Sequence, residues 1–300
     1  MIKAFPKIFA LGTDYIKDIL DGEVEITEKV DGSQFGFGRI DGELYVRSKG
    51  CMLHIGAPNN MFKEAVDYIE SIQDRIPDNT IFHAEYLQTP HHNSLTYEKI
   101  PKNHLSLFSI SDSTEKFFNY EDIKTWADKL DIDAVPLVYK GMIEKTDQIL
   151  ELIGSPSYLG KCNMEGVVVK NYNKPFLLGG QPIPVMCGKY VSEQFKEVHR
   201  AGWTGEHTGR GKWETFKDGY KTEARWMKAV QFLRDSGELT ESPKDIGKLI
   251  KRVMEDIEEE EKETIKTFLW SEFGKEVLRS SVHGLPEFYK LQLLKKLDDK

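Results

Sequence analysis

The chain has 300 residues, of which 39% are hydrophobic and 30% charged, and a formal net charge of −8. This composition is typical of a globular protein with one large domain or two, and no apolar run approaches the roughly 18 residues of a membrane-spanning helix. The acidic balance argues against a protein that coats nucleic acid through a global positive field, although it permits a local basic groove.

The cysteines indicate a reducing compartment. Cys51, Cys162 and Cys187 are odd in number, far apart and without a Cys-x-x-Cys pair. This pattern argues against a disulfide framework and against a cysteine zinc site. The first residues also lack the layout of a signal peptide. We therefore expect a cytoplasmic protein that does not associate with a membrane.

The first two-thirds of the chain predicts an α+β domain over residues 1–203. Short runs of β-type composition alternate with turn residues, and Asp41-Gly42 is a typical hairpin turn between two of them. The predicted strands are 34–40, 43–46, 80–87, 105–110, 135–139 and 166–169, and the predicted helices are 60–76, 120–130 and 145–153. Antiparallel sheets with flanking helices fit this mixture.

The chain changes character near residue 204. A glycine-rich polar stretch there predicts a linker, and almost everything after it has helical periodicity. The predicted helices are 221–234, one that starts at Ser242-Pro243 and one that starts near Pro286. In the first of them Trp226, Val230 and Leu233 are expected on one apolar face. We predict an all-helical C-terminal domain over residues 204–300.

Lys29 is the candidate nucleophile. It lies in the sequence Glu28-Lys29-Val30-Asp31-Gly32, directly after the alternating run 24–27. A lysine at a strand end, beside a carboxylate and a tight turn, is placed to attack a phosphorus and carry a nucleotide as a phosphoramide. Because a free lysine is protonated near pH 7, such a nucleophile needs burial or neighbouring cations to lower its pKa. The same residues also describe an ordinary strand-end hairpin turn, so the rest of the sequence has to decide.

Groups that would support such a nucleophile follow in order along the same domain. They are Arg47-Ser48-Lys49-Gly50, Glu85 in the strand that starts at Phe82, Phe108, the run from Glu165-Gly166 to Lys170, and Lys189. Taken singly, the glutamates fit surface acids, the phenylalanine a core residue and the later lysines strand ends. Alternation places Glu85 on the same face as His83, and an inward carboxylate without a partner is costly. Together the groups indicate a nucleotide site.

In this order and spacing, residues 24–191 resemble the covalent nucleotidyltransferase superfamily of ATP-dependent ligases and capping enzymes, and most closely the phage-type RNA ligases. Ser48-Lys49-Gly50 follows the RNA ligase form, whereas DNA ligases and capping enzymes usually carry an arginine after the serine and append an OB-fold. Two positions depart from the pattern. The closing motif has one lysine, Lys189, in place of two, and Ser109 in place of aspartate follows Phe108.

The resemblance implies an ATP-dependent RNA ligase that acts in RNA repair, with a nucleotidyltransferase domain. Lys29 would attack the α-phosphorus of ATP to form lysyl-AMP. The AMP would pass to an RNA 5′-phosphate, and a 3′-hydroxyl would then displace it. The implied cofactors are ATP and Mg²⁺ or Mn²⁺, because hard cations assist phosphoryl transfer.

Roles for individual residues follow from the resemblance and from the chemistry of the groups. The expected catalytic residues are Lys29, Asp31, Glu165, Lys170 and Lys189. The expected nucleotide contacts are Glu28, Lys29, Gly32, Lys49, Glu85, Phe108, Lys170 and Lys189. The expected metal ligands are Glu85 and Glu165, with Asp31 as a further oxygen donor. Lys170 and Lys189 would also lower the pKa of Lys29. The expected RNA contacts are Arg47, Lys49, Arg210 and Lys212, with Lys217, Lys221 and Arg225 further along the tail.

Other functions remain open at this stage. A DNA ligase and a capping guanylyltransferase use the same chemistry, and a catalytically silent RNA-binding protein could keep the same fold. We expect a monomer whose partners are RNA ends with a 5′-phosphate and a 3′-hydroxyl, in the cytoplasm (of the host, if the chain is phage-encoded). Whether the substrate is a nick, an open end or a broken tRNA loop is not determined by the sequence.

Overall fold

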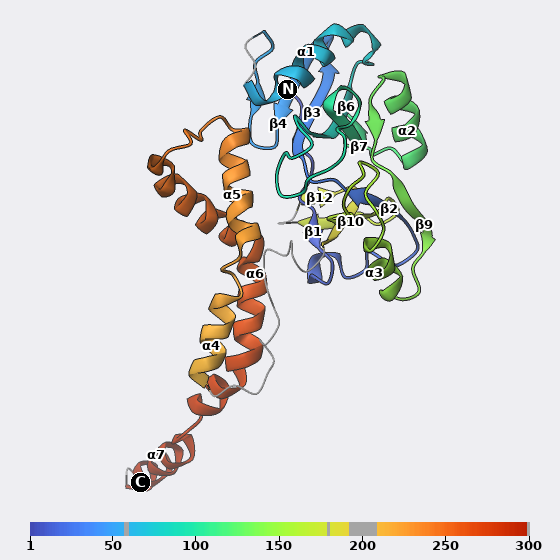
Figure 1. The fold of residues 1–300 in the computed structure, drawn as a ribbon. Helices are drawn as coiled ribbons and strands as arrows, with labels where there is room; N and C mark the ends of the chain where they lie inside the picture. The colour runs from blue at the N-terminus through green and yellow to red at the C-terminus, as the bar shows by residue number, and fades with distance from the viewer. Residues whose placement is uncertain (57–59, 179–180, 192–208, 299–300) are drawn as a thin grey trace. The chain divides into compact units, whose positions relative to one another are not determined.

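The computed structural model describes residues 1–56, 60–178, 181–191 and 209–298, except for the side chains of a few residues within these ranges. The chain forms two compact units, Met1–Leu249 and Ile250–Lys300 (Figure 1). The first unit contains both large β-sheets. No helix in the described ranges is both long and apolar enough to cross a bilayer.

Sheet A is built around two antiparallel strands that carry or flank the candidate nucleophile. In spatial order its strands are β1 (Phe9–Ala10), β13 (Met186–Val191), β10 (Gly166–Asn171), β2 (Glu23–Lys29) and β9 (Leu137–Met142). All neighbours are antiparallel except β1 and β13. Every residue of β10 is buried, which suits its valine-rich composition and its place inside the sheet. A separate hairpin pairs β11 (Phe176–Leu178) with β12 (Gln181–Ile183).

Sheet B is a longer antiparallel array with one parallel pair at its edge. In spatial order its strands are β5 (Met52–Leu53), β4 (Glu43–Ser48), β3 (Ser33–Ile40), β6 (Thr80–Tyr86), β7 (Leu105–Asp112) and β8 (Asp133–Ala134). Only β7 and β8 are parallel. The predicted turn between β3 and β4 is confirmed, since Asp41 and Gly42 both have positive φ, as a tight hairpin turn requires.

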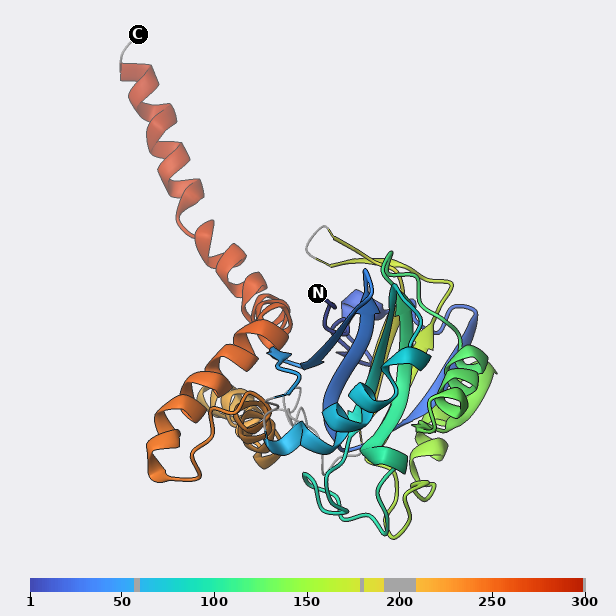
Figure 2. The same ribbon diagram turned by 90° about the horizontal axis from the view of Figure 1, so that it is seen from above.

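One face of each sheet is covered by helices. Phe82, Ala84 and Tyr86 of β6 point into a core that includes α1 (Lys63–Ser71) and α2 (Tyr120–Lys129). These two helices lie along one face of sheet B (Figure 2). Sheet A packs its own apolar face against α3 (Asp147–Ile153). The amphipathic spacing of the three helices accounts for this arrangement.

A third apolar cluster draws side chains from both sheets. It includes Phe5 from the N-terminal segment, Leu87 at the end of β6, Phe108 on β7 and Cys187 on β13. These residues come from the sheet faces that the helices do not cover, because neighbouring residues on a strand alternate between faces. Four of the candidate site residues, Lys29, Glu85, Lys170 and Lys189, belong to the same faces.

The predicted α+β class, with antiparallel sheets and flanking helices, is confirmed. The predicted strands are present with ends that differ by a few residues. The segment 60–76 is less regular than predicted, since only Lys63–Ser71 is α-helical and 3-10 turns stand on either side.

The tail is helical, as predicted. The helices α4 (Gly209–Asp218) and α5 (Glu223–Asp235) belong to the first unit, and α6 (Ile246–Ser281) and α7 (Leu285–Asp298) follow. Ser242 caps the turn that leads into α6, with a capping box formed with Asp245. The predicted domain boundary at residue 204 lies outside the described residues and stays a prediction.

The predicted apolar face of α5 is confirmed for Leu233, which is buried, and wrong for Trp226. Trp226 is 53% exposed, and the buried side chains of the helix include Arg225, Ala229 and Leu233. The buried face is therefore rotated by about one residue from the predicted one. The face was predicted from the large apolar side chains alone. The structure also buries two polar side chains of α5, Arg225 and Asp235.

Candidate active site

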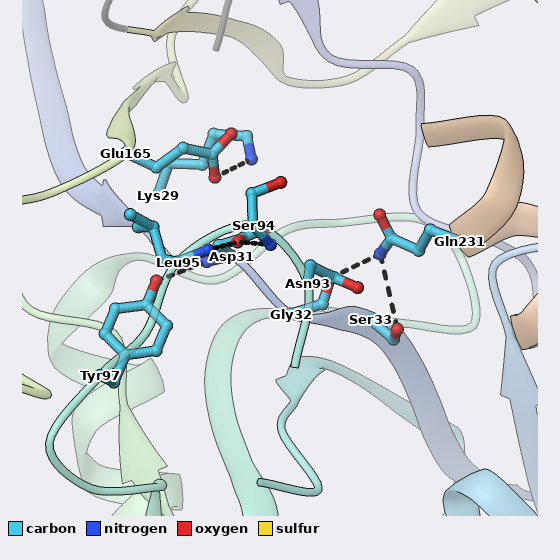
Figure 3. Close-up of polar contacts among 10 residues, drawn as sticks. All are labelled: Lys29, Asp31, Gly32, Ser33, Asn93, Ser94, Leu95, Tyr97, Glu165 and Gln231. Carbon is cyan, nitrogen blue, oxygen red and sulfur yellow. Dashed lines mark hydrogen bonds and ion pairs between the residues drawn. The ribbon is translucent and has the colours of Figure 1, made fainter. Parts of the chain in front are cut away.

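Lys29 and Glu165 meet because β2 and β10 are neighbouring strands. Lys29 ends β2 and pairs with Gly166, which begins β10. Glu165 immediately precedes Gly166, and its Oε2 accepts a hydrogen bond from Nζ of Lys29 at 2.5 Å (Figure 3). The lysine side chain is 26% exposed and the glutamate 11%. The strand register thus joins two motifs that are 136 residues apart in the chain.

Two glycines allow the backbone to pack tightly around this pair. A Cβ on Gly166 would lie 2.2 Å from the carbonyl oxygen of Tyr190, and a Cβ on Gly32 would lie 2.8 Å from that of Tyr86. No side chain fits at either distance, so both positions need glycine. Gly32 therefore holds the turn after Lys29 against the end of β6, the strand that carries Glu85.

Asp31 anchors the turn that follows the lysine. Its Oδ2 accepts hydrogen bonds from the backbone N–H groups of Ser94 and Leu95, both at 2.7 Å. Its own backbone N–H donates to the hydroxyl of Tyr97 at 2.9 Å (Figure 3). Such charge-assisted bonds to backbone N–H groups fix a loop firmly. The catalytic role of Asp31 stays a prediction.

The prediction that Lys170 and Lys189 lower the pKa of Lys29 is wrong for the chain without nucleotide. Burial acts to lower this pKa, but the surrounding carboxylates, led by Glu165, outweigh burial and raise it. Lys170 stands four residues along β10 from the partner of Lys29, about 13 Å away at the usual rise per residue. A carboxylate in hydrogen-bond contact acts more strongly than a cation at that separation, so the pKa of Lys29 is raised in the chain without nucleotide.

Glu85 is the least satisfied acid of the site. Its Oε2 is shielded from solvent and has no hydrogen-bond partner among the residues that the structure describes. Burial raises the pKa of Glu85 to about 8, and Lys29 only partly offsets burial. A carboxyl group in this state takes up either a proton or a cation readily. Its orientation toward the site agrees with the alternation of β6, while its roles toward metal and nucleotide stay predictions.

Lys170 reaches a bulge in β7. The pairing of β6 with β7 shifts register between His83 and Ala84, which leaves Phe108 as an extra residue. The carbonyl of Phe108 accepts a hydrogen bond from Nζ of Lys170. The lysine is 2% exposed, and burial lowers its pKa. The rings of Phe5 and Phe108 stand 5.9 and 5.7 Å from its Nζ.

Phe108 is a core residue as well as a candidate base contact. Its ring is 9% exposed and meets the ring of Phe5 edge-on at a centroid distance of 5.1 Å. The N-terminal segment that carries Phe5 is held by Arg47, which donates to the carbonyl of Ile2 at 3.1 Å. Stacking of Phe108 on adenine stays a prediction.

Lys189 lies within electrostatic reach of the central pair. It pairs with Val168 in the register of β10 and β13, so it shares the sheet face of Lys29. Burial raises the pKa of Glu165, and Lys29 and, more weakly, Lys189 act against that shift. The structure therefore places four of the five predicted catalytic residues on one face of β2, β10 and β13 or directly beside it. The fifth, Asp31, lies in the adjoining turn.

Glu28 lies on the face of β2 opposite to Lys29, because successive residues of a strand alternate. Its Oε1 accepts a hydrogen bond from Ser157 Oγ at 2.5 Å, and its Oε2 accepts one from the N–H of Tyr158 at 3.1 Å. The side chain is 3% exposed, and burial raises its pKa. These contacts fix the loop before Glu165. The adenine contact predicted for Glu28 stays a prediction.

Arg47, a predicted RNA contact near the end of β4, is hydrogen-bonded to the turn that follows the strand. Besides Ile2, Arg47 donates to the carbonyls of Ser48 and Lys49 at 3.0 and 3.3 Å. Three of its donors are thus used within the protein. Binding of RNA by Arg47 and Lys49 stays a prediction.

The predicted RNA contacts in the tail have different outcomes. The side chains of Arg210 and Lys212, at the start of α4, lie outside the described residues. Lys217 and Lys221 are exposed and pair with neighbouring acids. The prediction for Arg225 is wrong, because its side chain is completely buried. A buried guanidinium cannot reach an RNA backbone.

Sequence reasoning missed the polar residues that gather around Ser33. His92 and Asn93 come from the loop after β6, and Gln231 and Asp235 come from α5. One signal was available. Asp235 ends a helix, where the macrodipole disfavours a carboxylate, so a buried partner was to be expected there.

A divalent cation fits the donor set in a limited way. Within residues 1–56, 60–178, 181–191 and 209–298, no group of three or more His, Cys, Asp or Glu side chains has the geometry to hold a metal ion. Glu85 and Glu165 are nevertheless two acids beside one lysine, and the first has a shielded oxygen without a partner. Mg²⁺ commonly takes one or two carboxylates and completes its shell with water and phosphate. The two residues suit that kind of site.

Comparison with known proteins gave one family and a set of distant structures. A family model described as RNA ligase matches residues 22–183, more than half of the chain. Naegleria gruberi RNA ligase with PPi is 21% identical, with a TM-score of 0.48, over 64% of this chain and 56% of that chain. A mutant of the same ligase with ATP and Mn is 19% identical, with a TM-score of 0.47, over 65% and 57%. The chain therefore spans little more than half the length of these structures. No curated protein matches it.

Proposed function

This chain belongs to the RNA ligase family, and we propose that it joins RNA ends through a covalent AMP on Lys29. Nζ of Lys29 attacks the α-phosphorus of ATP, the bond to the β-phosphate oxygen breaks, and pyrophosphate leaves. The AMP then moves to an RNA 5′-phosphate, which frees the amine. A 3′-hydroxyl finally attacks the activated phosphate, and AMP leaves as the phosphodiester forms.

One observation carries this proposal, namely the 2.5 Å contact between Nζ of Lys29 and Oε2 of Glu165. The motifs that contain Lys29 and Glu165 come together because β2 and β10 pair in this register. In another register the two side chains could not act in one reaction. The contact also gives the lysine a proton acceptor. Since burial raises the pKa of Glu165, this carboxylate is a better base than an exposed glutamate.

The remaining charged groups balance the phosphates. Lys189 and Lys170 lie on the sheet face of Lys29. Lys189, the nearer of the two, would balance the charge that develops as pyrophosphate leaves. Glu85 and Glu165 would hold Mg²⁺ or Mn²⁺ together with phosphate oxygens and water. Such an ion, when bound, neutralises both the acids and the phosphates. ATP with one of these ions is the proposed cofactor pair.

The proposed partners are RNA ends with a 5′-phosphate and a 3′-hydroxyl, met by a monomer in the cytoplasm during RNA repair. Arg47 and Lys49 sit at one turn of sheet B, and the exposed lysines of α4 and its end, Lys217 and Lys221, offer further phosphate contacts.

Labelling with α-³²P-ATP tests the first step. We expect the purified chain to acquire label with Mg²⁺ or Mn²⁺, and Lys29→Ala to acquire none. Lys145→Ala, which removes an exposed lysine of the same domain, is the matched control and should label normally. Label on Lys29→Ala would refute the nucleophile. Label from α-³²P-GTP alone would favour a capping guanylyltransferase.

Substrate class is tested separately with 5′-phosphorylated strands. We expect sealing of RNA at a nick or between open ends, and little sealing of an all-DNA nick. Preference for the DNA nick would replace the RNA ligase proposal with a DNA ligase. Binding of RNA without label or sealing would leave a catalytically silent RNA-binding protein.

A further inference from the structure

Helix α5 touches the turn that follows Lys29. Nε2 of Gln231 donates a hydrogen bond to the carbonyl oxygen of Gly32 at 2.6 Å (Figure 3). Nδ2 of Asn93 donates to the same oxygen at 2.9 Å. Both lone pairs of that carbonyl are therefore used, one by a loop of the sheet region and one by the helix. The carbonyl lies three residues from the nucleophile.

A second contact from the same helix reaches Ser33. Asp235, which is 5% exposed, accepts a hydrogen bond from Ser33 Oγ at 2.9 Å. The serine oxygen also contacts Nε2 of His92 at 2.9 Å. Because the N–H of Gln88 donates to Nδ1 of His92 at 3.1 Å, the ring proton sits on Nε2. The direction of the chain is thus fixed: histidine donates to serine, and serine donates to aspartate.

Helix α5 also lies close to the turn of Ser48-Lys49-Gly50. The ring of Phe232 borders the space beside Gly50, since a Cβ added to that glycine would lie 3.4 Å from its Cζ. Lys49 in the same turn is close enough to act against the burial that raises the pKa of Asp235. The helix therefore contacts the turn after Lys29 and lies close to the Ser48-Lys49-Gly50 turn, both of which the sequence assigned to the nucleotide site.

Burying a carboxylate at the C-terminal end of a helix is costly, both through desolvation and through the helix dipole. A helix that only packs against the domain does not need a buried carboxylate, because apolar side chains such as Leu233 supply packing at lower cost. Here the carboxylate of Asp235 accepts a hydrogen bond from the hydroxyl of Ser33, the residue next to Gly32. Fully satisfied polar networks of this kind fix a single geometry.

We propose that α5 is a positioning element of the active site, which holds the turn after Lys29 through Gln231 and Asp235. The inference rests on the proposed function. With the helix docked, Nζ of Lys29 stays aligned for attack on phosphorus. When these contacts are lost, the turn moves and the attack slows, because displacements of about 1 Å cost up to 100-fold in rate.

The test compares single-turnover labelling by α-³²P-ATP with amide hydrogen exchange over residues 31–33. Gln231→Glu keeps the size of the side chain but sets an acceptor against the Gly32 carbonyl, and Gln231→Ala removes the donor without adding charge. For both we expect about a tenfold lower rate constant at saturating ATP, an unchanged half-saturating ATP concentration and faster exchange at the turn. Asp235→Ala should behave likewise.

Two variants serve as matched controls. Asp235→Asn keeps an oxygen that accepts from Ser33, so it should retain most of the wild-type rate. Gln73→Glu makes the same chemical change at an exposed site in the 3-10 turn after α1 and should have no effect. Unchanged rate and exchange in both Gln231 variants would overturn the proposal, as would failure of Asp235→Asn to rescue the loss in Asp235→Ala.

The exchange measurement does not depend on catalysis. If the wild-type chain takes up no label, the proposed function fails. Faster exchange in Gln231→Ala would then still support the contact between α5 and the turn, and unchanged exchange would overturn that as well.

Discussion

Lys29 and Lys170 stand at opposite ends of the same strand pair, and their pKa values shift in opposite directions. At the Lys29 end, Glu165 is in contact and further carboxylates are nearby, so the pKa rises although burial acts to lower it. At the Lys170 end, the cross-strand residue is Glu25, whose carboxylate already pairs with Lys140 at 3.0 Å. Burial therefore prevails there and lowers the pKa.

The comparison shows that burial alone does not make a lysine nucleophilic. A buried lysine loses its proton readily only where the nearby acids are already paired with another cation, as Glu25 is with Lys140. Near Lys29, Glu165 and Glu85 act on the lysine and raise its pKa. Under the proposed function, the divalent cation that accompanies ATP would neutralise these acids and so lower the pKa of Lys29.

The largest expected effect comes from Glu165→Gln. This variant removes the acid that contacts Lys29, which among the described residues has no counterpart in hydrogen-bond contact with Lys170. If the proposed function holds, we expect labelling of the chain by ATP to fall at least 100-fold, because Lys29 would lose its base and the cation a ligand. The pKa of Lys29, followed by NMR after reductive ¹³C-methylation, should fall toward that of a buried lysine. A pKa that stays high would mean that other groups hold the proton.

Replacing each lysine by methionine separates their contributions to stability. Lys29→Met leaves Glu165 shielded without its cation, and we expect a loss of about 2 kcal/mol in urea unfolding. Lys170→Met should cost about 1 kcal/mol or less, because the lost hydrogen bond to Phe108 is offset by no longer burying a cation. A larger loss of unfolding free energy for Lys170→Met than for Lys29→Met would contradict this prediction.

Stability should also depend on pH through Glu85. Its pKa is about 8 in the fold and near 4.5 when unfolded, so the folded chain binds more protons between these values. The stabilising contribution is full below about pH 4.5 and is lost as the pH rises to about 8. Since the residue is partly exposed, we expect a difference of only about 1.5 kcal/mol between wild type and Glu85→Gln across this range. Parallel pH profiles for the two proteins would contradict the prediction.

The smallest effect is expected on the opposite face of β2. Ser157→Ala removes one hydrogen bond to Glu28 and should cost about 1 kcal/mol of stability. If Glu28 acts mainly on the loop before Glu165, labelling by ATP at saturation should stay within twofold of wild type. A large fall in labelling would place Glu28 in the nucleotide site instead.

Local signals predicted most of the elements. The strands were visible in alternation and turn residues, and Asp41-Gly42 marked its hairpin because both residues tolerate positive φ. The bulge at Phe108 was not predictable, since it depends on the register between two strands. The buried face of α5 was mistaken because polar side chains, Arg225 and Asp235 among them, take part in it.

The sequence by itself determined which reactive and charged groups are present. Lys29 before an Asp-Gly turn, two later glutamates and two later lysines indicate nucleotidyl transfer, because residue type sets which groups can attack, bind cations or balance phosphate. Tertiary structure decided which of these groups meet. The register of β2 and β10 brings Glu165 rather than Lys170 to Lys29, and α5 reaches the turn from about 200 residues away in the chain. Proximity across strands and helices sets local charge and burial, and these in turn set the pKa of Lys29.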